Sequence, residues 1–174
     1  MTFLDVMEAH AAPAPSGVVD RIGPILRVGI PTTGGKILRA AREAGYSVLF
    51  STNAFMVRNA NGEMVSVRRP DPRQFAGLDA ALDSAGFVAM ARYRGFPWTI
   101  EQYLDLVESW PWAWYASWDQ CVEPEIASSK IDVFFRLAET CRLLSEVRTR
   151  ARDRGLPDPM PVVQGWEVDH YRWS

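Results

Sequence analysis

Cysteine is scarce in this sequence, and long apolar runs are missing from it. The two cysteines, Cys121 and Cys141, are too few for a disulfide framework, and their spacing matches no zinc motif. No stretch approaches the roughly 18 consecutive apolar residues that a membrane-spanning helix needs. The first twenty residues contain acidic side chains but no Lys or Arg, unlike a secretory signal. We therefore expect a cytoplasmic protein with no membrane segment and no metal or other cofactor in this chain.

Charge of one sign is not in excess either. The sequence has 19 Lys and Arg against 21 Asp and Glu, a net charge of -2 at pH 7, which argues against indiscriminate binding to nucleic acid. The length of 174 residues favours a single domain. A stretch rich in Pro, Gly and Ala between residues 10 and 24 predicts a flexible N-terminal segment over residues 1–24 and a folded domain over residues 25–174.

Short apolar runs alternate with helical patterns along the domain, which is typical of consecutive β-α units around a parallel sheet. An Asn-Gly pair at 61–62 lies between two apolar-containing runs and predicts a hairpin inserted over residues 55–69. We expect an α/β fold with about five parallel strands. The predicted strands cover residues 26–30, 47–51, 87–91, 113–117 and 161–164, and the predicted helices cover 36–44, 74–84, 99–109 and 126–154.

Polar residues that follow two of these strands are candidates for binding, because ligands of parallel β/α folds bind at the carboxyl ends of strands. Asp119 could accept two parallel N–H bonds from a guanine-like base edge. Gln164 could donate to a purine O6, and Gly165 would let a ligand approach the backbone. A cap of the following loop by Asp119, and a plain turn at Gln164, are the structural alternatives.

Further candidates lie on the same predicted face. A tryptophan there could stack on a base, and arginines near the inserted hairpin could contact phosphate groups. Core packing and a solvated charged surface are the alternatives for these two groups. The additional candidates are Trp118, Ser51 and Asn53 for the base, and Arg68, Arg69 and Arg92 for the phosphates.

Together, the two strand ends resemble the tRNA-guanine transglycosylase superfamily, and more closely its branch that places 7-deazapurines in the DNA of phages and bacteria. A family segment of the form Ser-Phe-Asp-Glu-Cys-x-Pro carries the aspartate that reads the base, and residues 117–124, Ser-Trp-Asp-Gln-Cys-Val-Glu-Pro, are similar. A later family strand ends in Val-Gln-Gly, whose glutamine reads O6, and residues 163–165 match it. The resemblance covers about residues 26–170.

A third family motif, Asp-Ser-Gly-Gly-Phe, ends an earlier strand of the tRNA enzymes and carries an acid/base aspartate. Residues 51–55, Ser-Thr-Asn-Ala-Phe, look like the corresponding stretch, so that Ser51 would stand at the acid/base position. This departure from the family pattern favours DNA over tRNA as the partner.

The resemblance implies a fold, a reaction and a set of partners. The fold would be the N-terminal half of a (β/α)8 barrel, and the reaction would exchange guanine for a 7-deazaguanine in DNA. The family nucleophile and the family zinc site would lie beyond Ser174, so we expect the chain to be inactive alone. Its partner would be a C-terminal half or further copies of itself.

Two alternatives from other functional classes stay open on the sequence. One is a non-catalytic module that binds a purine or a nucleic-acid strand. The other is a small Mg²⁺-dependent β/α enzyme that uses Asp119, Glu123 and Glu125, because carboxylates are the ligands that Mg²⁺ prefers.

Overall fold

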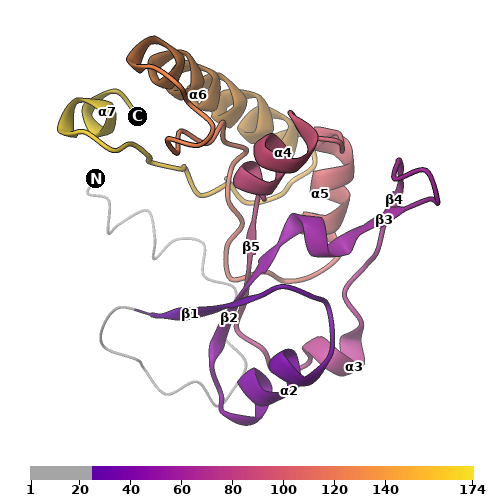
Figure 1. Cartoon of the computed structure of the whole chain (residues 1–174). Helices are drawn as coiled ribbons and strands as arrows, with labels where there is room; N and C mark the ends of the chain where they lie inside the picture. Colours follow the sequence, from indigo (N-terminus) through magenta and orange to yellow (C-terminus); the bar gives the residue numbers. More distant parts are fainter. Residues whose placement is uncertain (1–24) are drawn as a thin grey trace.

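The computed structural model describes residues 25–174, so the flexible segment expected over residues 1–24 lies outside the described part. It is a mixed α/β structure with a three-stranded parallel sheet, a separate hairpin and six α-helices (Figure 1). In chain order the elements are β1 (Arg27–Ile30), α2 (Lys36–Glu43), β2 (Ser47–Ser51), the 3-10 helix η1 (Thr52–Phe55), β3 (Met56–Arg58), β4 (Met64–Val67), α3 (Pro72–Phe75), β5 (Ala80–Asp83), α4 (Gly86–Tyr93), α5 (Ile100–Glu108), α6 (Lys130–Asp153) and α7 (Val168–Trp173).

The sheet has the strand order β1-β2-β5, and every pair in it is parallel. Two single parallel bridges continue the pairing beyond β5, one between Leu82 and Tyr115 and one between Ala116 and Met160. Neighbours in space thus follow one another in sequence, with helices between them. The first two predicted strands are confirmed. The strand expected over 113–117 is reduced to single bridges at Tyr115 and Ala116, and the one expected over 161–164 is not formed, because the bridging residue is Met160, just before it.

The third predicted strand is wrong. Residues 87–91 belong to helix α4, and the true strand is β5, inside the segment 74–84 that the pattern assigned to a helix. Helix α3 is only one turn long because Gly77, with φ 76°, follows it. The run Ala-Ala-Leu at 80–82 is fully buried on both faces, and periodicity cannot separate so short an apolar run from a helical segment.

The inserted hairpin is confirmed. Strands β3 and β4 pair antiparallel, with Met56 opposite Val67, and Gly62 in the connecting loop has φ 82°. In Figure 1 the tip of the hairpin projects away from the sheet, while β4 contacts α5. It follows directly on β2 through η1, so its base lies at the carboxyl end of that strand.

A cluster of aromatic side chains packs β2 against α3 and η1. Phe50 of β2 stacks on Phe75 of α3 with ring centroids 4.7 Å apart, and Phe55 and Trp112 meet these rings edge-on. All three phenylalanines are fully buried, and such offset and edge-on contacts add to the hydrophobic gain from burial. This cluster fixes η1, and therefore the base of the hairpin, against β2.

Helices α5 and α6 lie on the side of β5 that faces away from β2 (Figure 1). Helix α5 begins with the expected capping box, in which Thr99 and Gln102 bond each other's backbone N–H groups. Helix α7 packs on α6 near the carboxyl end of the described chain (Figure 1). None of the described helices is both long enough and apolar enough to cross a membrane.

A buried tyrosine connects α5 to the segment that leads to Asp119. The Tyr103 hydroxyl donates to the carbonyl oxygen of Ala116 at 2.5 Å, and both groups are excluded from water. Burial raises the pKa of Tyr103 well above its usual range, so the hydroxyl stays protonated and donates at neutral pH.

We expect Tyr103→Phe to lower the free energy of unfolding by about 1–3 kcal/mol, because the Ala116 carbonyl would lose its donor in a dry environment. Urea denaturation monitored by circular dichroism measures this change. The control is Tyr46→Phe, whose ring is 57% exposed. Equal stability of the two variants would show that the Tyr103 bond contributes nothing.

Candidate functional site

The carboxyl ends of β2 and β5 lie side by side. Ser51 is in register with Asp83, the last residue of β5. The Thr52 hydroxyl donates to the Asp83 carbonyl at 2.6 Å, and the Asp83 carboxylate accepts from the Ala85 N–H at 2.9 Å. Ala85 has φ 66°, a left-handed conformation that a residue with a Cβ rarely adopts. The chain therefore makes a tight, strained turn from β5 into α4, and it keeps Asp83 at the sheet edge.

Asp119 lies against this turn. Its Oδ1 accepts a hydrogen bond of 2.6 Å from the Ser84 hydroxyl, and only 9% of the residue is exposed. The carboxylate occupies the space beside Gly86, where an added Cβ would come within 2.4 Å of Oδ1. The missing side chain of Gly86 thus makes room for the carboxylate at the start of α4.

Burial raises the pKa of both carboxyl groups. Burial is the main cause that raises the pKa of Asp119 to about 6; the Ser84 hydrogen bond opposes this shift, and the nearby charges of Asp83 and Glu123 add to it. Burial also raises the pKa of Asp83, against the effect of backbone N–H bonds from Ala85 and Ser84. A buried carboxyl that titrates near neutral pH can hold or release a proton under physiological conditions.

Gln164 is bound within the protein. Its Nε2 donates to the Gln120 carbonyl at 2.9 Å and to the Thr140 hydroxyl at 3.2 Å, while Thr140 also accepts from the Gln120 N–H. Both amide hydrogens are therefore in use, and the expected donation to a purine O6 would require one of these bonds to break. The side chain instead ties the segment after Asp119 to α6 and to the last part of the chain.

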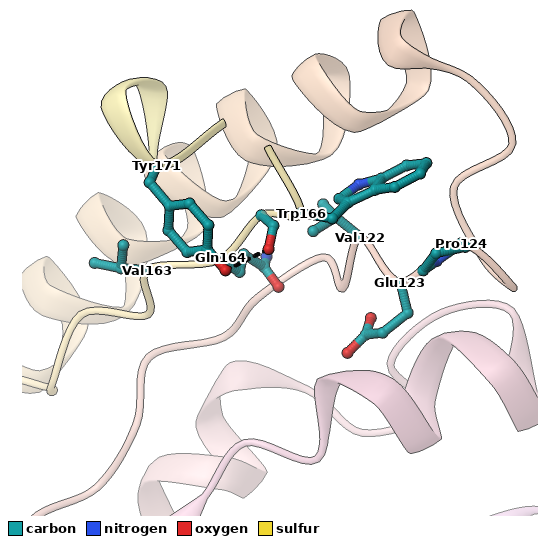
Figure 2. A pocket seen from close by; sticks show the side chains of 8 residues that line it. Val122, Glu123, Pro124, Val163, Gln164, Trp166 and Tyr171 are labelled. Atoms are coloured by element: carbon teal, nitrogen blue, oxygen red, sulfur yellow. Dashed lines mark hydrogen bonds between the residues drawn. The ribbon is translucent and has the colours of Figure 1, made fainter. Parts of the chain in front are cut away.

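A pocket of about 250 Å³ adjoins Gln164. Its volume is slightly below the roughly 300 Å³ of the smallest typical small-molecule sites. It lies between the segment that follows Cys121 and the segment around Gln164, as Figure 2 shows. Gly165 is held against His170, and its carbonyl accepts from the Tyr171 hydroxyl. Asp119 does not line this pocket, whose walls are Val122, Glu123, Pro124, Val163, Gln164, Gly165, Trp166 and Tyr171.

The other base-binding candidates differ in accessibility. Trp118 is buried and stacks on Phe96 with centroids 4.1 Å apart, so a base could reach that face only by displacing Phe96. The Ser51 hydroxyl is buried and bonds no group in the described part of the chain. Asn53 accepts from the Tyr93 hydroxyl at 3.4 Å. Ser51 and Asn53 thus lie at the predicted edge of the sheet, whereas Trp118 is part of the core.

The three arginine candidates lie around the hairpin and the end of α4. Arg68 and Arg69 are exposed at the base of the hairpin, directly after β4. Arg92 is exposed near the end of α4, with its guanidinium 5.7 Å from the centre of the Tyr93 ring. None of the three forms an ion pair with a described residue.

The carboxylates proposed for a magnesium site are not gathered. Glu123 and Glu125 are exposed, whereas Asp119 is buried against Ser84. Among residues 25–174, no group of three or more His, Cys, Asp or Glu side chains is close enough to hold a metal ion. The described residues thus do not form the site on which the Mg²⁺ alternative depended.

Sequence reasoning missed Asp83, Ser84 and Gly86, although a signal for them was present. Residues 83–87 read Asp-Ser-Ala-Gly-Phe and agree with the Asp-Ser-Gly-Gly-Phe motif at four of its five positions, a closer match than residues 51–55. The match was hidden because residue 83 fell near the end of a predicted helix, where no ligand-binding residue was sought.

Comparison with known proteins found no matching protein-family model, no matching curated protein and no matching solved structure.

We expect Asp119→Asn to stabilise the protein above pH 6. Because the folded state binds the Asp119 proton more tightly than the unfolded chain, this group lowers stability as pH rises from its usual value of 3.8 to about 6, and the cost persists above that. The raised pKa corresponds to about 2–3 kcal/mol at pH 8. Thermal unfolding of wild type, Asp119→Asn and the exposed control Asp153→Asn between pH 4 and pH 8 measures it. Destabilisation of Asp119→Asn at pH 8 would contradict the assignment.

We expect Gly86→Ala to destabilise the protein by about 1–3 kcal/mol, because the new methyl group would overlap the Asp119 carboxylate. The matched control is Gly29→Ala, where an added Cβ has no neighbour within 4 Å. Chemical denaturation of both variants compares them. A stable Gly86→Ala variant in which Asp119 keeps its raised pKa would refute the close approach.

Proposed function

We propose that residues 25–174 form the base-recognising half of a barrel transglycosylase that exchanges guanine for a 7-deazaguanine in nucleic acid. The match of residues 83–87 to the family motif removes the departure on which the preference for DNA over tRNA rested. The observation that carries this proposal is the buried pair Asp83 and Asp119 at the carboxyl edge of a parallel sheet. In-order parallel neighbours, including the bridges at Tyr115 and Met160, support a partial barrel.

Asp119 would read the base. An ionised carboxylate accepts two N–H bonds, and guanine and its 7-deaza analogues present two such donors, N1–H and the 2-amino group, on one edge. Adenine offers an acceptor at N1 instead, so its edge would be repelled. Position 7 of the ring lies on the other side of the base, and reading this edge alone would accept both guanine and its 7-deaza form, as an exchange reaction requires.

Asp83 would act as the general acid/base. It stands where the family motif has its acid/base aspartate, and burial raises its pKa above the usual range of an aspartate, which favours proton uptake. Ser84 contacts both carboxylates, since its hydroxyl donates to Asp119 and its backbone N–H bonds the Asp83 carboxylate. This arrangement keeps the two groups distinct, with Asp119 as the acceptor for the ligand and Asp83 as the proton carrier.

Calorimetric titration of guanine, 7-deazaguanine and adenine tests the proposal. We expect wild type to bind the first two and not adenine, with affinity falling as pH drops below about 6, where Asp119 becomes protonated. Asp119→Asn should weaken binding roughly 10- to 100-fold, because one acceptor becomes a donor. Asp153→Asn should bind as wild type. Equal binding of adenine and guanine, or no binding by a folded chain, would refute base recognition at this site.

A further inference from the structure

Charge is divided unevenly between the two parts of the described chain. Residues 25–94 contain ten Lys and Arg against five Asp and Glu, whereas residues 95–174 contain eight against thirteen. The near-neutral net charge of the whole protein therefore conceals a basic part, with a formal charge of +5, and an acidic part, with a formal charge of -5. The hairpin and α4 belong to the basic part.

The basic residues of the two parts also differ in ion pairing. All eight basic residues between 95 and 174 form an ion pair, most of them along α6 with a neighbouring carboxylate. In residues 25–94 only Arg27 does so, with Asp79. The remaining basic residues of this part have no carboxylate partner among the described residues, and they are Lys36, Arg39, Arg42, Arg58, Arg68, Arg69, Arg73, Arg92 and Arg94.

Two of these arginines share one aromatic ring. The guanidinium carbon of Arg58, on β3, lies 4.1 Å from the centre of the Tyr93 ring, and that of Arg92 lies 5.7 Å from it. Arg58 donates through Nη1 to the Gly62 carbonyl, while its buried Nη2 bonds no group in the described chain. The Tyr93 hydroxyl donates to Asn53. The ring thus fixes the base of the hairpin, the end of α4 and η1 in one cluster.

This cluster lies at the same edge of the sheet as the carboxylate pair. Asn53 follows Ser51 by two residues, and Ser51 is in register with Asp83. Arg68 also belongs here, because its N–H donates to the Phe55 carbonyl at the base of the hairpin. Arginine guanidinium groups, with a tyrosine hydroxyl and an amide beside them, are the groups that proteins use to contact phosphates of a nucleic-acid backbone.

We propose that the surface formed by Arg68, Arg92, Tyr93 and Asn53 binds the phosphate backbone of a nucleic-acid strand whose unpaired base reaches Asp119, with Arg58 holding the Tyr93 ring in place. The choice of nucleic acid over another polyanion rests on the proposed function, because a base at the carboxylate pair brings its own phosphates to this edge. Enzymes that act on a base take it out of the stack, so a single strand should bind more tightly than a duplex.

Fluorescence polarisation with a labelled short single-stranded DNA tests this surface. We expect wild type to bind with an affinity that falls steeply as salt rises from about 50 mM, the signature of released counterions. Arg68→Gln combined with Arg92→Gln should weaken binding roughly tenfold and lower the salt slope by about 2, one for each lost phosphate contact. The matched control, Arg142→Gln combined with Arg152→Gln, removes the same charge from ion-paired positions on α6 and should bind as wild type.

Arg58→Lys is a second variant that keeps the charge but loses the planar stack on Tyr93, and it should weaken binding with an unchanged salt slope. The proposal is overturned if the folded wild type does not bind the strand, if the α6 control loses as much affinity as the hairpin pair, or if heparin binds more tightly than DNA through the same arginines.

The two proposals fail in different ways. Arg68→Gln with Arg92→Gln should leave calorimetric binding of free guanine unchanged, because neither residue contacts the carboxylate pair. Asp119→Asn should still bind the strand, since the arginines remain. Strand binding without guanine binding would therefore refute the base pocket alone, and the reverse result would refute the backbone surface alone.

Discussion

The rest of the site depends on one constraint, the burial of the Asp119 carboxylate against the start of α4. A carboxylate taken out of water must be hydrogen-bonded or it takes up a proton, and here the Ser84 hydroxyl supplies its side-chain donor. That contact requires a residue without a side chain at position 86 and a left-handed Ala85 before it. Tyr103 and Gln164 hold the backbone on either side of Asp119. The left-handed Ala85 and the buried carboxylate are both locally unfavourable, and both are needed to place Asp119; such local strain is common at functional sites.

Much of the fold follows from local patterns in the sequence. The Asn-Gly turn, the capping box at Thr99, the long apolar-faced helix and the first two strands all come from short-range signals, and the structure has each of them. The exchange of strand and helix around β5 could not be foreseen, because its Ala-Ala-Leu run is short and its burial depends on β2 and Tyr115. That error also hid Asp83, since a carboxylate inside a helix is not expected to bind a ligand.

The candidate site was predictable in position more than in detail. The pattern of strands predicted that Asp119 would follow a parallel neighbour of β5, and it does follow the bridges at Tyr115 and Ala116, but hydrogen-bond partners arise only from tertiary contacts. Gln164 donates both amide hydrogens, one to Gln120 and one to Thr140, and Trp118 stacks on Phe96 in the core. Ion pairing is likewise invisible in a net charge of -2. The structure reveals the unpaired arginines of residues 25–94, because all eight basic residues of 95–174 have a carboxylate partner and only Arg27 of the first part does.

Carbon-13 NMR of the Asp119 carboxyl group, followed through a pH titration with and without guanine, tests the central claim most directly. The account predicts that the free protein titrates at about 6, and that guanine lowers this pKa because its N–H donors favour the charged form. A carboxyl group that titrates near its usual 3.8, or one whose pKa does not respond to guanine, would contradict the assignment of Asp119 as the base-reading residue.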